Sequence, residues 1–135
     1  MLNKRHLLAG FALTLAAIPF VAAVAPAAAL DKAPFDAKAF EDAQTAGKAI
    51  LVEITAPWCP TCKAQAPVVA ALMREPRMKD VKLFIADFDT EKDLKKALTV
   101  YSQSTFVVFK GGKEVARQTG QTDKAVIESV FAKAL

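Results

Sequence analysis

The apolar and polar positions along the chain predict a sheet of four strands. Two nearly continuous apolar runs, at 49–55 and 81–89, are typical of central strands that are covered on both faces. A third apolar run, at 106–109, is followed by a turn at Gly111-Gly112 and by a strand at 114–119. This last arrangement predicts an antiparallel hairpin.

Two of the predicted helices consist mainly of charged and small residues. The helix at 36–48 has Asp36 as its expected N-cap and ends near Gly47. The helix at 90–101 has Thr90 as its candidate N-cap, because a threonine hydroxyl can accept a hydrogen bond from the first turn.

Two further helices are more apolar. The first begins at Cys59 or Pro60, and Pro67 is expected to kink it because proline has no N–H to donate. The second, at 122–135, is amphipathic. Its residues expected to face the core are Ala125, Val126, Val130 and Phe131.

The order of these elements predicts the fold class. Helices and strands alternate first, and the chain then closes with a hairpin and a helix. This order predicts an α/β fold with a mixed central sheet and helices on both faces. A single domain at 30–135 accommodates all of it.

An uncharged leader precedes this domain. Lys4 and Arg5 are followed by a run without charge at 7–30, and Ala-x-Ala at 27–29 matches a signal-peptidase site. We therefore expect residues 1–29 to be a secretory signal peptide that is removed. The alternative is an uncleaved anchor, because the apolar run approaches the length of a membrane span.

Removal of the leader would change the chemistry that is available. The net charge would fall from +4 to +2, because Lys4 and Arg5 leave and no acidic residue does. The remaining charges are interspersed, which argues against a nucleic-acid partner. His6 is the only histidine, so the mature chain would lack a Cys–His pair, a Ser–His–Asp triad and a Cys₂His₂ zinc site.

The candidate chemistry lies in the only two cysteines, Cys59 and Cys62. A disulfide across so short a loop removes little entropy from the unfolded chain, so a purely structural role is disfavoured. A redox dithiol and a metal clip remain. A helix N-terminus stabilises a thiolate through its free N–H groups and its dipole. Cys59 is therefore the expected attacking thiol, and Cys62, one turn further and more enclosed, the expected resolving thiol.

Two neighbours of the cysteines are candidate functional residues. Trp58 offers a flat apolar surface, which serves either packing or, as we favour beside a Cys-x-x-Cys, client binding. Glu53 interrupts an apolar strand six residues before Cys59. Burial would raise the pKa of this carboxyl, and it could then accept the proton of Cys62. The alternative is an edge position with Glu53 in water.

These residues resemble the thioredoxin family over essentially the whole of 30–135. The resemblance rests on Trp58-Cys59-x-x-Cys62-Lys63, with an acidic residue six positions before the first cysteine and a proline eight positions after it. FVVFKGGKEV at 106–115 and Gly120 before the last helix extend it.

The resemblance implies the thioredoxin fold and thiol–disulfide exchange without a cofactor. It assigns Cys59 as nucleophile, Cys62 as resolving thiol and Glu53 as the buried acid. The surface expected to bind clients consists of Trp58, Pro60, Thr61, Gln103, Ser104 and Thr105.

Three departures from the family pattern bear on function. Pro60-Thr61 replaces the usual Gly-Pro and lacks the histidine of many disulfide oxidants, which argues for a reductant. Ser104 stands where the family has a cis-proline, so the Gln103–Ser104 peptide is expected to be trans or strained. Ile85 replaces the lysine that usually neighbours the buried acid, which would raise the pKa of Glu53 further.

Ser104 also leaves a metal-handling alternative open. In the family the cis-proline is thought to keep metals from the dithiol, so a serine could admit Cu(I) or an Fe–S fragment to Cys59 and Cys62. Two thiolates without a histidine make an incomplete site, and redox exchange is favoured. The sequence thus predicts an exported, monomeric reductase of protein disulfides in a bacterial-type periplasm, supplied with electrons by a membrane protein. A thiol oxidant is the alternative within redox chemistry.

Overall fold

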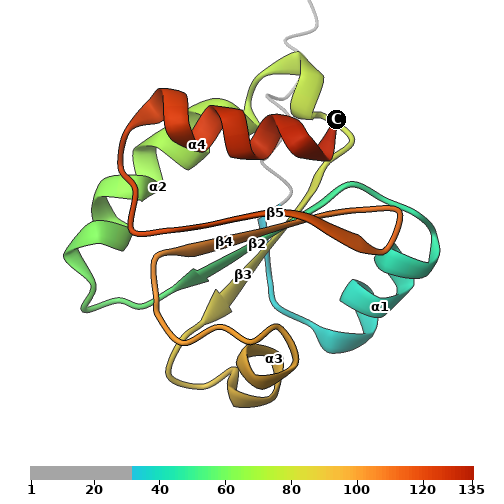
Figure 1. Ribbon diagram of the computed structural model, residues 1–135, viewed down its shortest axis with the longest axis horizontal. Coiled ribbons are helices and arrows are strands. Elements are labelled where there is room, and N and C mark those ends of the chain that lie inside the picture. The colour runs from blue at the N-terminus through green and yellow to red at the C-terminus, as the bar shows by residue number, and fades with distance from the viewer. Residues whose placement is uncertain (1–31) are drawn as a thin grey trace, which may run out of the picture.

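The computed structural model describes residues 32–135 as a five-stranded sheet with helices on both faces (Figure 1). The expected signal peptide at 1–29 lies outside the described residues. Within the described part, no helix is long and apolar enough to cross a bilayer. The elements are β1 Lys32–Pro34, α1 Ala37–Thr45, β2 Ile50–Thr55, α2 Pro60–Met73, β3 Lys82–Asp87, α3 Lys92–Ala97, β4 Thr105–Lys110, β5 Lys113–Thr119 and α4 Lys124–Phe131, with 3-10 turns at Pro76–Met78 and Ala132–Ala134.

The sheet is mixed, as the sequence predicts. Its order is β1-β3-β2-β4-β5, in which β3 runs parallel to both of its neighbours and β4 runs antiparallel to β2 and β5. The strand that the sequence pattern missed is β1, which pairs with β3 over three residues. So short a strand shows no periodicity, and its pairing comes from the neighbouring strand.

Two apolar cores lie on opposite faces of the sheet. In Figure 1, α2 and α4 cover one face and α1 and α3 cover the other. Leu51 packs in the core on the α2 and α4 side, whereas Ile50 and Val52 pack in the core on the α1 and α3 side. Both faces of β2 are therefore buried, which explains its continuous apolar sequence.

The phase predicted for α4 is wrong in part. Ile127 and Phe131 are buried, and Val130 packs against the same core, but Ala125 and Val126 are exposed. Within α4 the buried residues Ile127 and Phe131 lie four positions apart, and the half-buried Val130 lies between them, so the buried face begins one position after Val126. Phe131 lies edge-on to Phe106 of β4, with ring centroids 5.1 Å apart, and this contact fixes the phase.

Of the two predicted helix N-caps, one is confirmed and the other is wrong. Asp36 caps α1 as predicted, because its carboxylate accepts the N–H of Ala39 at 2.7 Å. Thr90 does not cap α3, which begins after Glu91 without a side-chain cap. The carboxylate of Asp87 instead accepts hydrogen bonds from the backbone N–H and the hydroxyl of Thr90. An acidic side chain at the end of β3 thus engages the threonine in a turn.

The corrected phase of α4 gives a matched pair of variants. We expect Ile127→Ala to lower the free energy of unfolding by about 2–5 kcal/mol, because it opens a cavity in a closed core. Val126→Ala, at a position that is 39% exposed, should change it by less than about 1 kcal/mol. Urea unfolding followed by circular dichroism measures both. Equal losses, or a larger loss at Val126, would contradict the assigned phase.

Candidate active site

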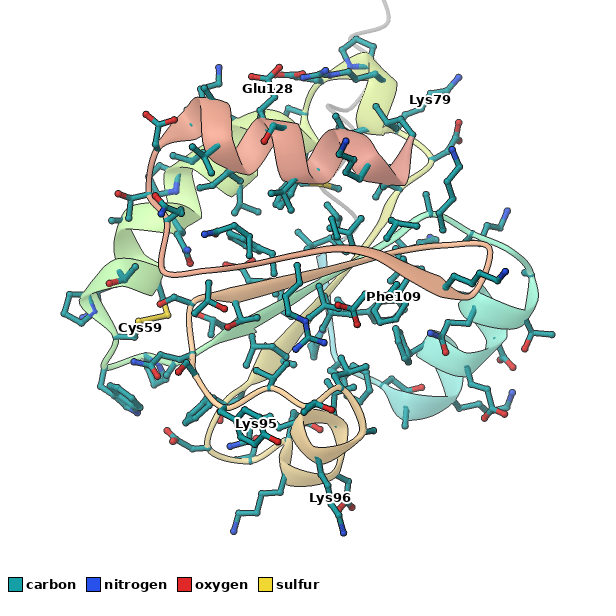
Figure 2. All side chains as sticks on the ribbon, in the orientation of Figure 1. Cys59, Lys79, Lys95, Lys96, Phe109 and Glu128 are labelled. Atoms are coloured by element: carbon teal, nitrogen blue, oxygen red, sulfur yellow. A yellow bond between two sulfur atoms is a disulfide. The ribbon has the colours of Figure 1, made fainter. Side chains whose placement is uncertain are left out.

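The two cysteines lie where three segments meet at one end of the sheet. β2 ends at Thr55, α2 begins at Pro60, and the loop before β4 approaches from the side (Figure 2). Cys59 and Cys62 form a disulfide there, with their Cα atoms 5.3 Å apart.

The start of α2 is built around the sulfur of Cys59. Cys59 is the N-cap residue in extended backbone geometry, and its Sγ accepts the N–H of Cys62 at 3.0 Å. The sulfur thus takes the place of the oxygen that a serine or aspartate cap would supply. Pro60 occupies the first helical position, where the lack of an N–H has no cost.

Both cysteines are covered. Cys59 is 1% exposed and Cys62 is 4% exposed, so the expectation that Cys62 is the more enclosed residue is wrong. They form a small apolar cluster with Ala56, against which Phe88 packs. The N-cap position folds the Cys59 side chain back over the helix end, where the loop before β4 covers it.

Ser104 belongs to that loop and contacts both sulfurs. Its Oγ lies 3.0 Å from the Sγ of Cys59 and 3.1 Å from the Sγ of Cys62. Residues 32–135 contain no cis peptide bond, so the Gln103–Ser104 peptide is trans, in line with expectation. Ser104 has a φ of 60°, in the left-handed region that side-chain-bearing residues seldom adopt.

Glu53 lies in the interior of the sheet. It pairs with Ile85 of β3 on one side and with Phe106 of β4 on the other, and it is 6% exposed. The alternative of an edge position in water is therefore wrong. The register also places Ile85 directly beside Glu53, as the comparison with the family pattern predicts. Because side chains alternate along a strand, Glu53 shares the face of Leu51, beneath α2 and α4.

The other expected client-binding residues differ in exposure. Trp58 is 54% exposed, so it does not serve core packing, and its Nε1 donates to the carboxylate of Asp89 at 2.7 Å. Pro60 is exposed, whereas Thr61 and Gln103 are half-buried. Thr105 is buried, and its hydroxyl donates to the carbonyl of Ser102 at 2.8 Å.

Gln65 is a site residue that the sequence analysis missed. It is fully buried in α2, and its Nε2 donates to the backbone carbonyls of Gln121, at 2.7 Å, and Ser104, at 3.3 Å. Its Oε1 has no hydrogen-bond partner among the described residues. A signal was present, because Gln65 lies three positions after Cys62, in phase with the buried face of α2.

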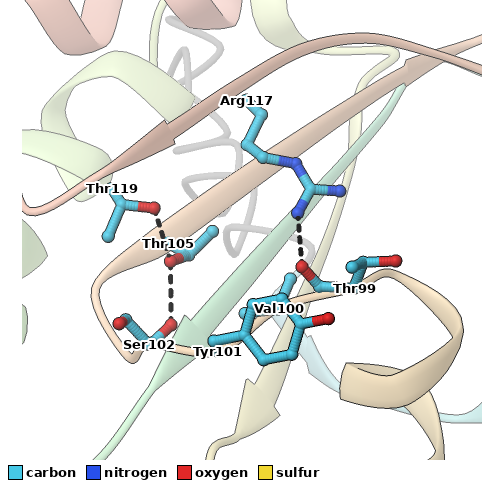
Figure 3. Close-up of a pocket in the computed structure, with 7 residues that line it drawn as sticks. All are labelled: Thr99, Val100, Tyr101, Ser102, Thr105, Arg117 and Thr119. Atoms are coloured by element: carbon cyan, nitrogen blue, oxygen red, sulfur yellow. Dashed lines mark hydrogen bonds between the residues drawn. The ribbon is translucent and has the colours of Figure 1, made fainter.

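A small pocket of about 180 Å³ lies behind the loop that carries Ser104 (Figure 3). Arg117 lines it and donates to the carbonyls of Leu98 and Thr99, at 2.6 and 3.1 Å. A hydrogen bond to Glu114 raises the pKa of Arg117 above its usual value. Through these hydrogen bonds, Arg117 holds the loop before β4 in place. The pocket is lined by Thr99, Val100, Tyr101, Ser102, Thr105, Arg117 and Thr119.

The metal-handling alternative would need ligands in addition to the two cysteines. Within the part of the chain that the structure describes, no group of three or more His, Cys, Asp or Glu side chains could hold a metal ion. The metal-handling alternative therefore depends on the cysteine pair itself.

Comparison with known proteins identifies the family. The family model described as thioredoxin matches residues 30–133. The chain belongs to the thioredoxin family. Its fold is the thioredoxin fold, and the crystal structure of Trxlp from Edwardsiella tarda EIB202 is similar, with a TM-score of 0.72 and 33% identity. That likeness covers 74% of this chain and 97% of Trxlp.

Curated relatives agree with this assignment. A thioredoxin H-type from Fagopyrum esculentum is 30% identical over 95 residues, which cover 70% of this chain and 80% of the relative. The bifunctional thioredoxin reductase/thioredoxin of Mycobacterium leprae is 34% identical over 92 residues, and the match spans only 20% of that longer protein. Thioredoxin-family proteins are thiol–disulfide oxidoreductases that use their own cysteine pair, and this chain has such a pair at Cys59 and Cys62.

Proposed function

We propose that this thioredoxin-family protein reduces protein disulfides in a bacterial-type periplasm, as a monomer that receives electrons from a membrane protein. The observation that carries the chemistry is the hydrogen bond from the N–H of Cys62 to the Sγ of Cys59 at the start of α2. A thiolate at that position gains from this donor and from the helix dipole. Cys59 is therefore the proposed nucleophile.

The proposed reaction has two exchange steps. The Cys59 thiolate attacks one sulfur of a client disulfide, so a Cys59–client bond forms, the client S–S bond breaks, and the second client sulfur leaves as a thiolate. Cys62 then attacks the Sγ of Cys59. The Cys59–Cys62 disulfide forms, and the first client sulfur leaves with the electron pair. Two electrons have passed to the client, whose two thiolates take up protons.

Glu53 is the proposed acceptor for the proton of Cys62. Its burial in the central strand supports this role, since a carboxyl that is withdrawn from water holds a proton more readily than an exposed one. The exposed side chains of Trp58 and Pro60, together with the half-buried Thr61 and Gln103, are the proposed surface for clients.

The proposed direction of electron flow rests on the dipeptide between the cysteines and on the proposed location. The Pro60-Thr61 dipeptide lacks the histidine found in many oxidants of this fold, which favours a reductant. An exported reductant has no soluble dinucleotide pool beside it, so a membrane protein is the proposed electron donor. A thiol oxidant remains the competing role for the same pair.

Substitution of each cysteine separates their roles. We expect Cys59→Ser to abolish reduction of a model protein disulfide, because the attacking thiolate is gone. Cys62→Ser should form a mixed disulfide with the client and fail to release it. Insulin reduction and non-reducing gel electrophoresis with mass spectrometry measure the two effects. Full activity of Cys59→Ser would refute the proposed nucleophile.

The reduction potential decides the direction. For a reductant we expect equilibrium with a glutathione or dithiothreitol buffer to give a value near −270 mV, whereas an oxidant would lie near −120 mV. The fraction of oxidised protein, counted by thiol alkylation and mass spectrometry, gives the value. A result at the oxidant end would overturn the reductase role while leaving the exchange chemistry intact.

Export is tested with the full chain in a bacterial host. We expect the periplasmic fraction to contain a species that lacks residues 1–29, because these residues have the features of a secretory signal. Intact-mass measurement identifies the cleavage point. A leaderless chain, in which an added initiator methionine directly precedes residue 30, serves as the cytoplasmic control. Full-length protein retained in the membrane fraction would support the anchor, and protein confined to the cytoplasm would refute export.

A further inference from the structure

The hydroxyl of Ser104 has an unusual position between two reactive atoms. It lies almost equally far from the two sulfurs, at 3.0 Å from Cys59 and 3.1 Å from Cys62. All three residues are buried, at 4% exposure or less. A hydroxyl has one proton to donate and two lone pairs to accept with, so it can donate to one sulfur and accept from the other.

The oxidised and reduced states use this hydroxyl differently. Disulfide sulfurs are weak acceptors, so in the oxidised protein the contact contributes little. A thiolate is a charged acceptor, and charge-assisted hydrogen bonds are roughly twice as strong as neutral ones. Cys59 already receives the N–H of Cys62, so a second donor adds to a site that favours the negative charge. The thiol of Cys62 can then donate its S–H to the Ser104 oxygen.

We propose that Ser104 donates its hydroxyl hydrogen bond to the Cys59 thiolate and thereby stabilises the reduced form of the pair. This role rests on the exchange chemistry proposed above, and it goes beyond the docking of clients at this position. When a dithiol or two molecules of glutathione supply two electrons, the Cys59–Cys62 bond breaks. Cys59 retains the thiolate, and Cys62 takes a proton. Ser104 keeps the charge on the sulfur that must attack.

The backbone holds Ser104 in this position at a cost. Its φ of 60° is unfavourable for a residue with a Cβ, and such strain persists only where the surroundings enforce it. Two donors do so here, because the carbonyl of Ser104 accepts the N–H of Gly120 at 2.9 Å and the Nε2 of Gln65 at 3.3 Å. The same Gln65 group also binds the carbonyl of Gln121, which ties the two loops together.

Two substitutions separate the hydroxyl from the backbone. Ser104→Ala removes the hydroxyl and retains the Cβ at the strained φ, whereas Ser104→Gly removes both the hydroxyl and the strain. We expect the two variants to behave alike in redox measurements. In each, the equilibrium with glutathione should move about tenfold towards the protein disulfide, a potential about 30 mV more negative. The pH midpoint of thiolate absorbance should move upwards in both.

The controls make the hydroxyl the sole variable. Ser102→Ala removes an exposed hydroxyl from the same loop and should leave the equilibrium and the pH midpoint at their wild-type values. Urea unfolding of the oxidised variants measures the backbone effect, and only Ser104→Gly is expected to gain stability from released strain. Wild-type values in Ser104→Ala, or a redox shift confined to Ser104→Gly, would overturn the inference.

This experiment distinguishes failure of the inference from failure of the proposed function. The glutathione equilibrium is measured on the cysteine pair without a client or an electron donor. If the wild-type pair exchanges with glutathione and Ser104→Ala matches it, the inference fails and the exchange chemistry stands. If the wild-type pair does not exchange at all, both are refuted.

Discussion

The pairing of β2 along both of its edges is the constraint on which the site depends. Because β3 and β4 satisfy its backbone on either side, β2 is fixed at the centre of the sheet, and Glu53 is held inside the protein. β4 runs antiparallel to β2, so the start of β4 lies beside the end of β2, with Thr105 opposite Ile54. This register brings Ser104 to Cys59 across 45 residues of sequence.

The second requirement is a helix that begins with a sulfur. An ordinary N-cap residue supplies an oxygen to the free N–H groups of the first turn, and Cys59 supplies its Sγ instead. The atom that caps the helix is therefore also the atom that exchanges bonds. Any change in its charge is felt at the helix end, and the capping hydrogen bond from Cys62 is strongest when the sulfur is a thiolate. The hydrogen bond from the N–H of Cys62 to the Sγ of Cys59 therefore both caps α2 and favours the thiolate.

Local patterns made much of the fold predictable. The central strands were found because burial on both faces leaves an apolar run, and Asp36 was found because a cap depends on its own helix alone. β1 and the face of α4 were not, since β1 owes its pairing to β3, and the phase of α4 is set by packing on Phe106. Thr90 was misassigned because Asp87, three residues earlier, competes for it.

In the site, too, the features set by local sequence were predictable and those set by distant contacts were not. Cys59, Cys62 and the burial of Glu53 follow from spacing and from strand composition, which are local. The contact of Ser104 with the sulfurs depends on sheet register and on a left-handed backbone turn, and the position of Gln65 depends on two distant carbonyls. The spacing of residues along the sequence does not show which distant segments come into contact in the fold.

The backbone at Ser104 also limits which residues this position can accept. A proline ring fixes φ near −65°, and Ser104 has a φ of +60°, so the two residues occupy different regions of conformational space. A direct exchange of serine for proline would oppose the loop as it now runs. A proline at this position would therefore need a different course of the loop, which would disturb the contacts of Gln65 and Gly120 with the carbonyl of Ser104. The substitution alone would combine a proline ring with a backbone conformation that the ring cannot adopt.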